Sequence, residues 1–569
     1  MKIMEYENLD LNIEEISNKL NIDKDIIEFL INQGYNENEI NLLTNKNYET
    51  LLPNDNITNV KEAAYLISNY IEDNEASIYI FSDYDSDGIN AGYIIYDTLV
   101  KTKKALESKC FIDLYIPQRV EGYGLNMTWC EEVIKDKSNK ILVITADNGI
   151  TKKDEVAFLK AHNIEVLITD HHEPQEKYLP DTLIVDPHLH DLNNNNALGL
   201  CGAAVIYKIC SYLLNNIYED TSNYSNIFLP NVAIATITDM MPVTEENIIF
   251  VKDGLILINK KHCNNAIKYY TEYLGEEIKA KNIAFEFGPQ LNACGRMGEV
   301  DKAISLLLTT NKEDIIDLYN QIVLINDKRK EKTKKIIELC KDKIKEEDYI
   351  IVLRIVNLGG VGGNVANQLM DIYNKPVILL TENKEEILSG SARSNSIDLQ
   401  VLFSLAKDKG LIESFGGHKE AAGVSINRKK IKDFVSFANT VIEQFLLEAM
   451  ENASIEEPKL YVDKIISVND LSANTVDKYK DILYFNNLEE PLFALKNVNI
   501  DKINQSKNNP NNLCFYFSDD NGNKSNPAWC WKFGETYNNL GKPEKVNLVF
   551  TLSKFKSMLV MDIKYMEAI

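Results

Sequence analysis

Between about residues 76 and 245 the sequence contains several short apolar runs, each of which ends in an acidic or glycine-rich turn. The runs occupy residues 78–81, 141–144, 166–168 and 184–185. Stretches of helix length, such as residues 92–100 and 153–162, separate them. Strand, helix and strand at this spacing predict a parallel sheet with helices on both faces, and therefore an α/β fold.

Three of these runs lead into clusters of acidic residues and histidines. Residues 83–88 read Asp-Tyr-Asp-Ser-Asp-Gly, residues 147–149 read Asp-Asn-Gly, and residues 170–172 read Asp-His-His. A further apolar run, residues 234–238, closes on Asp239 and is predicted to be another strand. Ligands of parallel α/β sheets bind beyond the carboxyl ends of the strands. We therefore expect four strands to deliver carboxylates and imidazoles to one edge of one sheet.

So many carboxylates in one place repel each other unless cations neutralise them. Their oxygens suit Mg²⁺ and Mn²⁺, and an added imidazole favours Mn²⁺. Two ions held about 3.5–4 Å apart by a shared carboxylate form the usual arrangement for attack on a phosphorus centre. A calcium loop is the alternative for residues 83–88, but such a loop needs a Glu several positions after the Gly, and residues 90–96 offer none.

The rest of the chain divides by pattern. Residues 10–70 read as helices, residues 314–345 as one long charged helix, and residues 457–569 alternate like β-structure. A second α/β unit is indicated by apolar runs at 349–353 and 377–380. We predict two α/β lobes joined by a long helix, followed by a C-terminal β-barrel. The predicted domains are a helical segment (1–70), a first α/β lobe with the acidic clusters (71–310), a connecting helix (311–348), a second α/β lobe (349–450) and a barrel (456–569).

The composition of the chain limits the binding partners and the cellular compartment that we expect. The formal charge of −24 argues against a general affinity for nucleic acid, although it leaves room for a local basic groove. There is no apolar run of about 18 residues and no signal peptide, so we expect no membrane association. The nine cysteines are scattered singly, which favours reduced thiols in a cytoplasm over disulfides or a zinc site.

The four acidic motifs resemble those of the DHH phosphoesterases. Further segments are similar to the RecJ-like exonuclease branch of that family, namely residues 117–125, 288–296, 326–330, 390–394 and 415–423. The resemblance extends over roughly residues 10–430. It implies a catalytic DHH domain, an associated DHHA1 substrate-binding domain and a barrel like those that bind oligonucleotides.

Carried over by position, the resemblance implies two Mn²⁺ or Mg²⁺ ions. Their ligands would be Asp85, Asp87, Asp147, His171 and Asp239, with Asp147 shared between the ions. His172 would be a catalytic group that touches the scissile phosphate. Asp83 and Asp170 would stand around the ligands, and Asp170 would orient His171.

A second set of residues would hold the phosphates of the substrate. This set is Arg119, Arg296, Ser391, Arg393, Gly417 and His418. A guanidinium group pairs with two phosphate oxygens at once, which suits this role. Arg296 and Arg393 lie in loops rich in small residues, which favours phosphate binding over a surface salt bridge. For Arg119 both interpretations remain open.

The implied activity is hydrolysis of single-stranded DNA from its 5′ end, in DNA repair and recombination. The resemblance also implies a monomer that works with a helicase and a single-strand-binding protein. Two local features depart from the family or leave a choice. Residues 357–363 lack the His that commonly opens the second lobe, and the aromatic residues Trp529, Trp531 and Phe533 alternate as if along one strand face. These aromatics would either stack on bases or form barrel core.

Three other functions compete with this one. A DHH phosphodiesterase for cyclic dinucleotides or short oligonucleotides needs only two lobes, so the length of the chain and its C-terminal segment count against it. A soluble pyrophosphatase would have no use for the arginines or the barrel. A non-catalytic scaffold protein for replication or repair would have lost metal ligands, whereas all four motifs are intact here.

Overall fold

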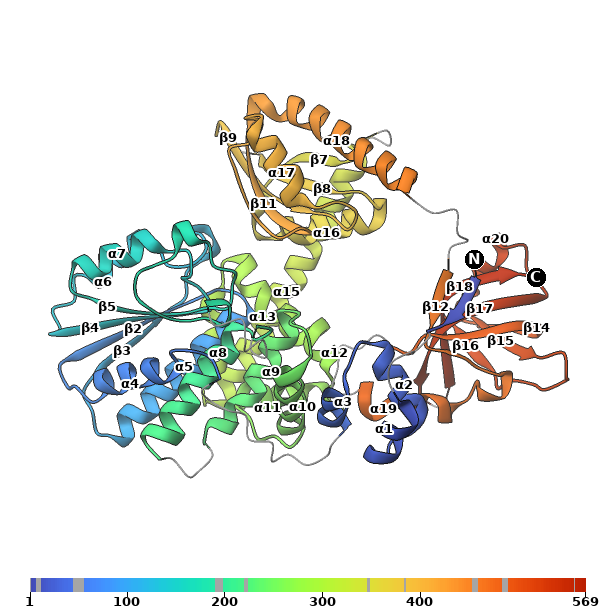
Figure 1. Ribbon diagram of the computed structural model, residues 1–569, viewed down its shortest axis with the longest axis horizontal. Helices are drawn as coiled ribbons and strands as arrows, with labels where there is room; N and C mark the ends of the chain where they lie inside the picture. The colour runs from blue at the N-terminus through green and yellow to red at the C-terminus, as the bar shows by residue number, and fades with distance from the viewer. Residues whose placement is uncertain are drawn as a thin grey trace.

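The computed structural model shows three bodies (Figure 1). It describes residues 2–6, 12–44, 56–189, 198–219, 224–344, 348–382, 385–452, 459–483, 490–556 and 558–569. The catalytic domain carries the second α/β lobe above it, and the barrel lies to one side. None of the helices in the described part of the chain combines the length and apolarity needed to span a bilayer.

The catalytic domain is built on a five-stranded parallel sheet, as predicted. The strand order is β3-β2-β4-β5-β6. Their bounds are β2 (Ala76–Ser82), β3 (Phe111–Tyr115), β4 (Lys140–Ala146), β5 (Glu165–Thr169) and β6 (Leu183–Val185). The prediction omitted β3, because this edge strand has no buried residue and lacks the continuous apolar run of its buried neighbours.

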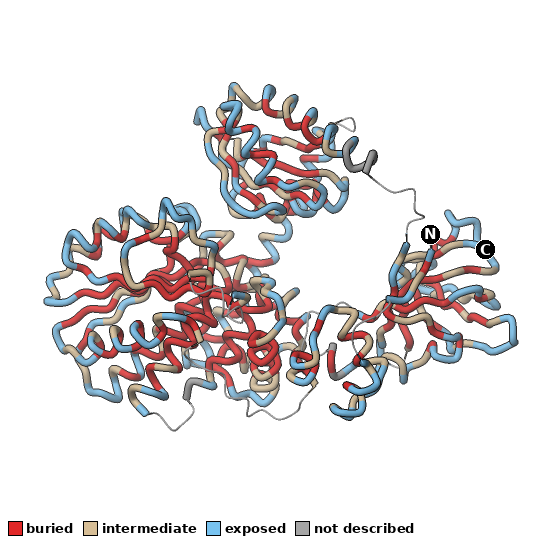
Figure 2. Tube along the Cα trace, viewed as in Figure 1, coloured by how far each residue is buried: buried red, intermediate tan, exposed pale blue. Residues whose placement is uncertain are grey.

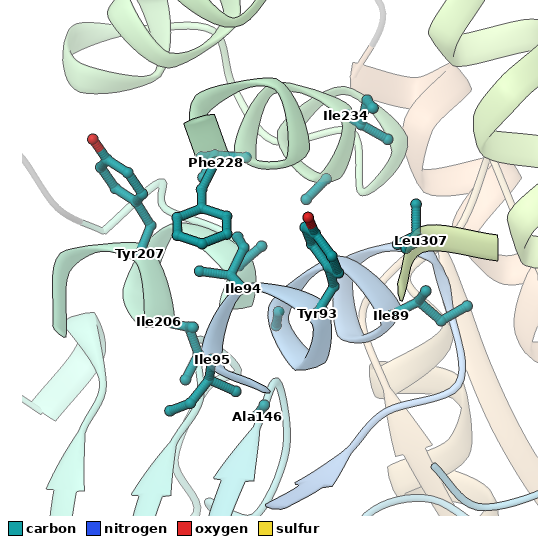
Figure 3. Packing of buried hydrophobic residues seen from close by; sticks show 14 of the residues in the cluster. Ile89, Tyr93, Ile94, Ile95, Ala146, Ile206, Tyr207, Phe228, Ile234 and Leu307 are labelled. Atoms are coloured by element: carbon teal, nitrogen blue, oxygen red, sulfur yellow. The ribbon is translucent and has the colours of Figure 1, made fainter. Parts of the chain in front are cut away.

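Helices cover both faces of this sheet. Ile78 and Ile80 point to the face packed by α4 (Val60–Ile71), α5 (Ser86–Ala105) and α8 (Gly202–Tyr212). Phe81 points to the other face, which is packed by α6 (Met127–Val133) and α7 (Lys153–Ala161). Figure 3 shows α5 presenting Ile89 and Tyr93 towards Phe228 and Leu307. The core therefore fixes α5, whose N-cap and first turn carry two of the predicted metal ligands.

The prediction of a strand at residues 234–238 was wrong. These residues belong to the helix α9 (Leu229–Thr238), and Asp239 is its C-cap. The helix is buried on all sides, against α5, α8 and α10 (Glu245–Asn259). A helix that is apolar all round gives a continuous apolar run, which periodicity cannot distinguish from a buried strand.

The predicted long helix is α15 (Lys312–Lys341), about 45 Å in length at the usual rise per residue. Its N-cap Asn311 accepts hydrogen bonds from the backbone of Glu313 and Asp314. Its first half packs into the catalytic core through Ile315 and Ile322, whereas Ile336 packs into the second lobe. One rigid element thus joins two separate cores. Helices α11 (Asn265–Leu274), α12 (Ala280–Asn282), α13 (Gly288–Met297) and α14 (Val300–Leu308) precede it.

The second lobe has a five-stranded mixed sheet in the order β10-β11-β9-β8-β7. The strands are β7 (Ile351–Val356), β8 (Val377–Glu382), β9 (Ile387–Arg393), β10 (Ser414–Gly417) and β11 (Ala421–Asn427). Within this sheet β7 and β8 are the parallel pair, because α16 (Gly362–Tyr373) crosses between them. Helices α17 (Leu399–Asp408) and α18 (Ile431–Asn452) complete the lobe.

The C-terminal segment forms the predicted barrel, in the order β13-β14-β15-β16-β18-β17 with β14 also paired to β17. Its elements are β13 (Lys464–Ile465), α19 (Ala473–Leu483), β14 (Phe493–Gln505), β15 (Leu513–Ser518), β16 (Ala528–Cys530), α20 (Gly534–Asn539), β17 (Lys545–Phe555) and β18 (Met558–Ala568).

The aromatic residues Trp529, Trp531 and Phe533 do not lie on one strand face, because β16 ends at Cys530. Trp529 and Trp531 stack with ring centroids 5.5 Å apart, and Trp531 is 41% exposed. Phe533 instead packs against Phe515 in the barrel core. Of the two interpretations left open by the sequence, the core one holds for Phe533, while the exposed face of Trp531 can be reached by a ligand.

The N-terminal segment packs against the barrel, far away in the sequence. Its first residues form a strand, β1 (Lys2–Glu5), where only helices were expected, and β1 pairs in parallel with β12 (Lys459–Val462). Helices α1 (Ile13–Leu20), α2 (Lys24–Asn32) and α3 (Glu37–Thr44) share a hydrophobic core with the barrel. Figure 2 shows the N-terminal helices between the buried residues of the barrel and the larger core of the catalytic domain.

Candidate metal centre and phosphate-binding groups

The acidic residues predicted to bind metal converge at the carboxyl edge of the parallel sheet. Asp83 follows β2, Asp147 follows β4 and His171 lies just after β5. The His171 Nε2 atom lies 3.2 Å from Asp147 Oδ1, 3.5 Å from Asp87 Oδ2 and 3.6 Å from Asp239 Oδ2. The helix α9 therefore delivers Asp239 to the same place that a strand was expected to reach.

The potential ligands form three sets of three. In each set the ligand atoms all lie within 4.8 Å of one another; the sets are Asp83, Asp85, Asp147, then Asp87, His171, Asp239, and finally Asp147, His171, His172, which links the first two. The contact between His171 and Asp147 joins them. This arrangement places Asp147 between two possible cation positions. It also places Asp83 among the potential ligands, closer in than the sequence suggested.

Two helix N-termini hold the carboxylates in position. Asp85 is the N-cap of α5, and its Oδ1 atom accepts hydrogen bonds from the backbone N–H groups of Asp87 and Gly88. Asp87 accepts hydrogen bonds from the first N–H groups of α8, Gly202 at 2.7 Å and Ala203 at 2.8 Å. The positive end of a helix dipole stabilises a carboxylate at this position. The sequence analysis did not identify residues 202–203 as part of the site.

The backbone around Asp147 is tightly constrained. Asp147 has φ 64°, a left-handed conformation that non-glycine residues rarely adopt outside functional sites. A Cβ atom on Gly202 would lie 2.5 Å from the Asp147 Cβ, so only glycine allows α8 to approach this closely. These constraints aim the Asp147 carboxylate into the cluster.

The electrostatics of the cluster fit bound cations. Burial, followed by the neighbouring carboxylates, raises the pKa of Asp83 and of Asp147 well above the ordinary value. The pKa of Asp239 is raised for the same reasons. Among the described residues no hydrogen bond reaches Oδ1 of Asp83 or Oδ1 of Asp147, although both atoms are buried. Buried carboxylate oxygens without donors suit hard divalent cations.

The two histidines differ in charge. Burial lowers the pKa of His171, which leaves its imidazole neutral and able to ligate a metal. Burial also acts against the charged form of His172, but the hydrogen bond from His172 Nδ1 to Asp170 Oδ1, 2.7 Å long, raises the pKa of His172 to about 9. The expectation that Asp170 orients the side chain of His171 was therefore wrong. Its carboxylate orients the side chain of His172. From His171 it accepts a hydrogen bond from the backbone N–H, not from the imidazole.

Tyr123 is a further member of the site that the sequence analysis did not single out. Its hydroxyl oxygen lies 3.1 Å from His172 Nδ1 and 3.3 Å from the carbonyl oxygen of Asp147. The only sequence signal was its position inside the motif at residues 121–125. Because this loop comes from elsewhere in the chain, no spacing rule relates Tyr123 to His172.

The predicted arginines gather beside the acidic cluster. Burial and then the charge of Arg119 lower the pKa of Arg296 to about 10, and burial and Arg119 also lower the pKa of Arg393. Arg329 of the connecting helix belongs to the same group, since its charge acts on Arg296 as well. Among the described residues none of these four arginines forms an ion pair with a carboxylate. Arg296 donates to the carbonyl oxygen of Gly360, and Arg119 lies over the ring of Tyr84.

The glycine-rich turn of the second lobe, residues 357–363, lies against positively charged side chains. A Cβ atom on Gly359 would lie 2.7 Å from Lys332 Nζ, and one on Gly363 would lie 2.8 Å from an Arg393 nitrogen. A Cβ on Gly362 would lie 3.5 Å from the Ser391 hydroxyl. Ser391 and Arg393 are therefore brought to the cluster, with backbone N–H groups of α16 beside them.

Gly417 and His418 are not brought to the arginines by any contact found in the described part of the chain. Both are exposed at the end of β10, on the edge of the second lobe. The His418 backbone N–H donates to the carbonyl oxygen of Ala421, and the Gly417 carbonyl oxygen accepts from Gln400. Their expected role in substrate binding stays a prediction.

Comparison with known protein families places each body of the molecule. Residues 77–236 match the DHH family N-terminal domain, residues 348–444 match the DHHA1 domain, and residues 462–557 match the RecJ OB domain. The three domains occur in this order along one chain. The chain is a RecJ-like member of the DHH family.

Individual relatives of this RecJ-like protein cover most of its length. It is 29% identical over 461 residues to the single-stranded-DNA-specific exonuclease RecJ of Haemophilus influenzae, covering 76% of this chain and 77% of that one. It is 30% identical to the RecJ of Bacillus subtilis over 73% of this chain and 51% of that one. A crystal structure of RecJ from Thermus thermophilus in complex with Mn²⁺ superposes with a TM-score of 0.79 at 22% identity, covering 100% of this chain and 79% of that one. That likeness supports the fold.

Proposed function

We propose that this protein is a metal-dependent exonuclease that degrades single-stranded DNA in the 5′-to-3′ direction during DNA repair or recombination. One observation carries the proposal. Two sets of potential metal ligands, joined at Asp147, lie beside four arginines that have no carboxylate partner among the described residues. A phosphodiester held by the arginines would be exposed to cations held by the acids. The named relatives are single-stranded-DNA-specific exonucleases.

The residues present fit Mn²⁺ or Mg²⁺, the ions found in the Thermus thermophilus structures. We assign one ion to Asp83, Asp85 and Asp147, and a second to Asp87, His171, Asp239 and the shared Asp147. Such ions, when bound, activate water and offset the charge that develops on the phosphoryl oxygens. Burial raises the pKa of Asp87, and the hydrogen bonds from the backbone N–H groups of Gly202 and Ala203 act against that rise by stabilising the ionised carboxylate.

The remaining groups of the site act on the substrate. His172, held protonated by Asp170, would donate a hydrogen bond to an oxygen of the scissile phosphate. Arg296 and Arg393 would hold neighbouring phosphates, and Arg119, from the loop after β3, would hold the end of the strand. We infer no base readout, because phosphate contacts carry no sequence information.

Several parts of the proposal rest on resemblance to the family. These are the 5′ polarity, the preference for DNA, action as a cytoplasmic monomer, and delivery of substrate by a helicase and a single-strand-binding protein. The relatives' names support the preference for single-stranded DNA, and the other parts follow from the family resemblance alone. A phosphodiesterase for cyclic dinucleotides or short oligonucleotides would use the same metal centre but would not need the barrel.

The test uses the purified protein, Mn²⁺ and single strands labelled at either end. We expect mononucleotides to be released progressively from the 5′ end, with no cutting of a circular single strand. Release from the 3′ end would overturn the polarity. Cleavage confined to dinucleotides would favour the phosphodiesterase, and binding without cleavage by metal-loaded protein would favour the scaffold.

A further inference from the structure

The helices at the N-terminus lie between the barrel and the catalytic domain (Figure 1). We call residues 12–44, which contain α1, α2 and α3, the N-terminal bracket. One side of the bracket contacts the barrel and the other contacts α10 of the catalytic domain. Its position along the chain, before the first strand of the catalytic sheet, gives no hint of this arrangement.

The barrel side of the bracket is held by charges and by an aromatic contact. Asp25 forms ion pairs with both Lys464 and Lys478, and Asp23 lies 2.7 Å from Lys478. The Phe29 ring meets the Tyr479 ring edge-on with centroids 5.5 Å apart. Shared burial adds to these contacts, because Phe29 and Tyr479 belong to the barrel's own hydrophobic core. The bracket and the barrel therefore behave as one unit.

The catalytic side of the bracket rests on α10 through α3. The Glu39 Oε1 atom accepts a hydrogen bond of 3.1 Å from the backbone N–H of Glu245, the first residue of α10. The Lys252 ammonium group, on a buried residue, donates to the carbonyl oxygen of Leu42. Ile248 of α10 is fully buried and belongs to the same hydrophobic core as the bracket and the barrel.

The helix α10 in turn packs along α9, which ends at the potential metal ligand Asp239. A continuous set of packed elements thus runs from the barrel through the bracket and α10 to the metal centre. Each junction is buried or hydrogen-bonded, so packed elements connect the barrel to the candidate metal centre.

We propose that the N-terminal bracket positions the barrel relative to the candidate metal centre, so that one long strand contacts both at once. The inference rests on the proposed action on single-stranded DNA. Two sites on one strand bind more tightly together than apart only when their spacing allows simultaneous engagement. The bracket would therefore govern the affinity for long strands and leave the chemistry unchanged. Glu39 and Lys252 are positioning residues in this scheme.

The test compares strands of two lengths in a double variant, Glu39→Ala with Lys252→Ala. For a long strand we expect KM to rise about three- to tenfold, the size of effect given by the removal of one or two hydrogen bonds, with kcat unchanged. For an oligonucleotide too short to reach from the metal centre to the barrel, both constants should match the parent. Small-angle X-ray scattering of the variant should give a larger radius of gyration, because the barrel is no longer fixed.

A matched control is the double variant Lys261→Ala with Glu272→Ala. It removes the same two residue types from an exposed ion pair in the catalytic domain, outside the bracket. We expect this control to behave like the parent in every measurement. A long-strand KM that stays at the parent value in the bracket variant would overturn the inference, whether or not the scattering changes. Equal losses on short and long strands would also count against it, since they would indicate damage to the catalytic domain.

The scattering measurement separates this inference from the proposed function. If the parent protein cleaves no single strand of either length, the proposed function fails. An unchanged radius of gyration in the bracket variant would by itself show that Glu39 and Lys252 do not hold the barrel. Thermal unfolding of both double variants checks that each remains folded at the assay temperature.

Discussion

The acidic cluster and the arginine cluster lie side by side but are built in different ways. The acids stand at the edge of one sheet within one domain, and backbone N–H groups of α5 and α8 fix two of them. The arginines come from the loop after β3, from α13, from the connecting helix and from β9 of the second lobe. The acidic cluster is therefore rigid, whereas the arginine cluster depends on how the two lobes are placed. Chemistry and substrate binding should respond differently to mutation.

The largest effect should come from the residue that both sets of ligands share. Asp147→Ala should lower kcat by about a thousandfold or more, because two cations would then repel each other without a common anion. The loss should appear for long and short strands alike. Metal content measured on the purified variant should fall below that of the parent. Turnover within tenfold of the parent would remove Asp147 from the centre of the mechanism.

The second prediction concerns cations and pH. A carboxylate whose pKa is raised on folding begins to destabilise the folded protein once the pH rises above the pKa that this group has in the unfolded chain. The destabilisation is complete once the pH exceeds the pKa of the group in the folded protein. Asp83, Asp147 and Asp239 all have raised pKa values. Without metal the melting temperature should therefore fall as the pH rises from about 4 towards these raised values.

Added Mn²⁺ should reverse that loss, because a bound cation displaces protons and stabilises the ionised carboxylates. The increase in melting temperature on adding Mn²⁺ should be larger at about pH 8 than at about pH 5.5. Differential scanning fluorimetry with and without a chelator measures it. A gain that shrinks as the pH rises would contradict the assignment of these acids to the cations. The Asp147→Asn variant should show a weaker pH dependence.

The third prediction tests the other cluster. Arg296→Ala or Arg393→Ala should weaken binding of single-stranded DNA and reduce its salt dependence by roughly one unit of slope for each phosphate that is no longer bound. Metal content should remain that of the parent, since neither arginine lies among the potential ligands. The affinity is measured over a series of salt concentrations. Parent-like binding by either variant at moderate salt would mean that the substrate does not pass this cluster.

The smallest effect is expected for Arg119, which lies over Tyr84 and lowers the pKa of Arg296 and Arg393. Arg119→Ala should reduce the preference for a 5′-phosphorylated end over a 5′-hydroxyl end, with kcat on a preferred end reduced only slightly. Cleavage rates of both ends are compared for parent and variant. If the ratio of the two rates is unchanged, Arg119 does not bind the end of the strand.

The local sequence was informative wherever function follows from chain direction. Each buried parallel strand gave a continuous apolar run, and the residue that follows such a strand must lie at the carboxyl edge of the sheet. Asp83, Asp147 and Asp170 could therefore be placed together from the apolar pattern alone. The same reasoning failed for residues 234–238, because a fully buried helix has no polar face to reveal its period. Asp239 nevertheless lies in the cluster as expected, since its position after an apolar run is the same for a helix and for a strand.

Groups that approach from other parts of the chain could not be found in this way. Gly202, Ala203 and Tyr123 reach the acids and His172 through packing of α8 and of the loop after β3. Arg329 reaches Arg296 because the connecting helix runs past α13. The interaction of Asp170 with His172 and not with the His171 side chain depends on side-chain orientation, which two adjacent histidines in a sequence do not specify.

The sequence by itself determined which residue types gather at the candidate metal centre, because strand direction and hydrophobic patterning act over a few residues. It also determined the presence of two α/β lobes, the long helix and the barrel. Only the tertiary structure decided which backbone groups hold Asp87 and which positively charged side chains face the glycine-rich turn. It alone also decided that residues 12–44 pack between the barrel and α10. These contacts join residues that are far apart along the chain. They depend on the burial of complementary surfaces, and no local pattern along the chain records which surfaces will meet.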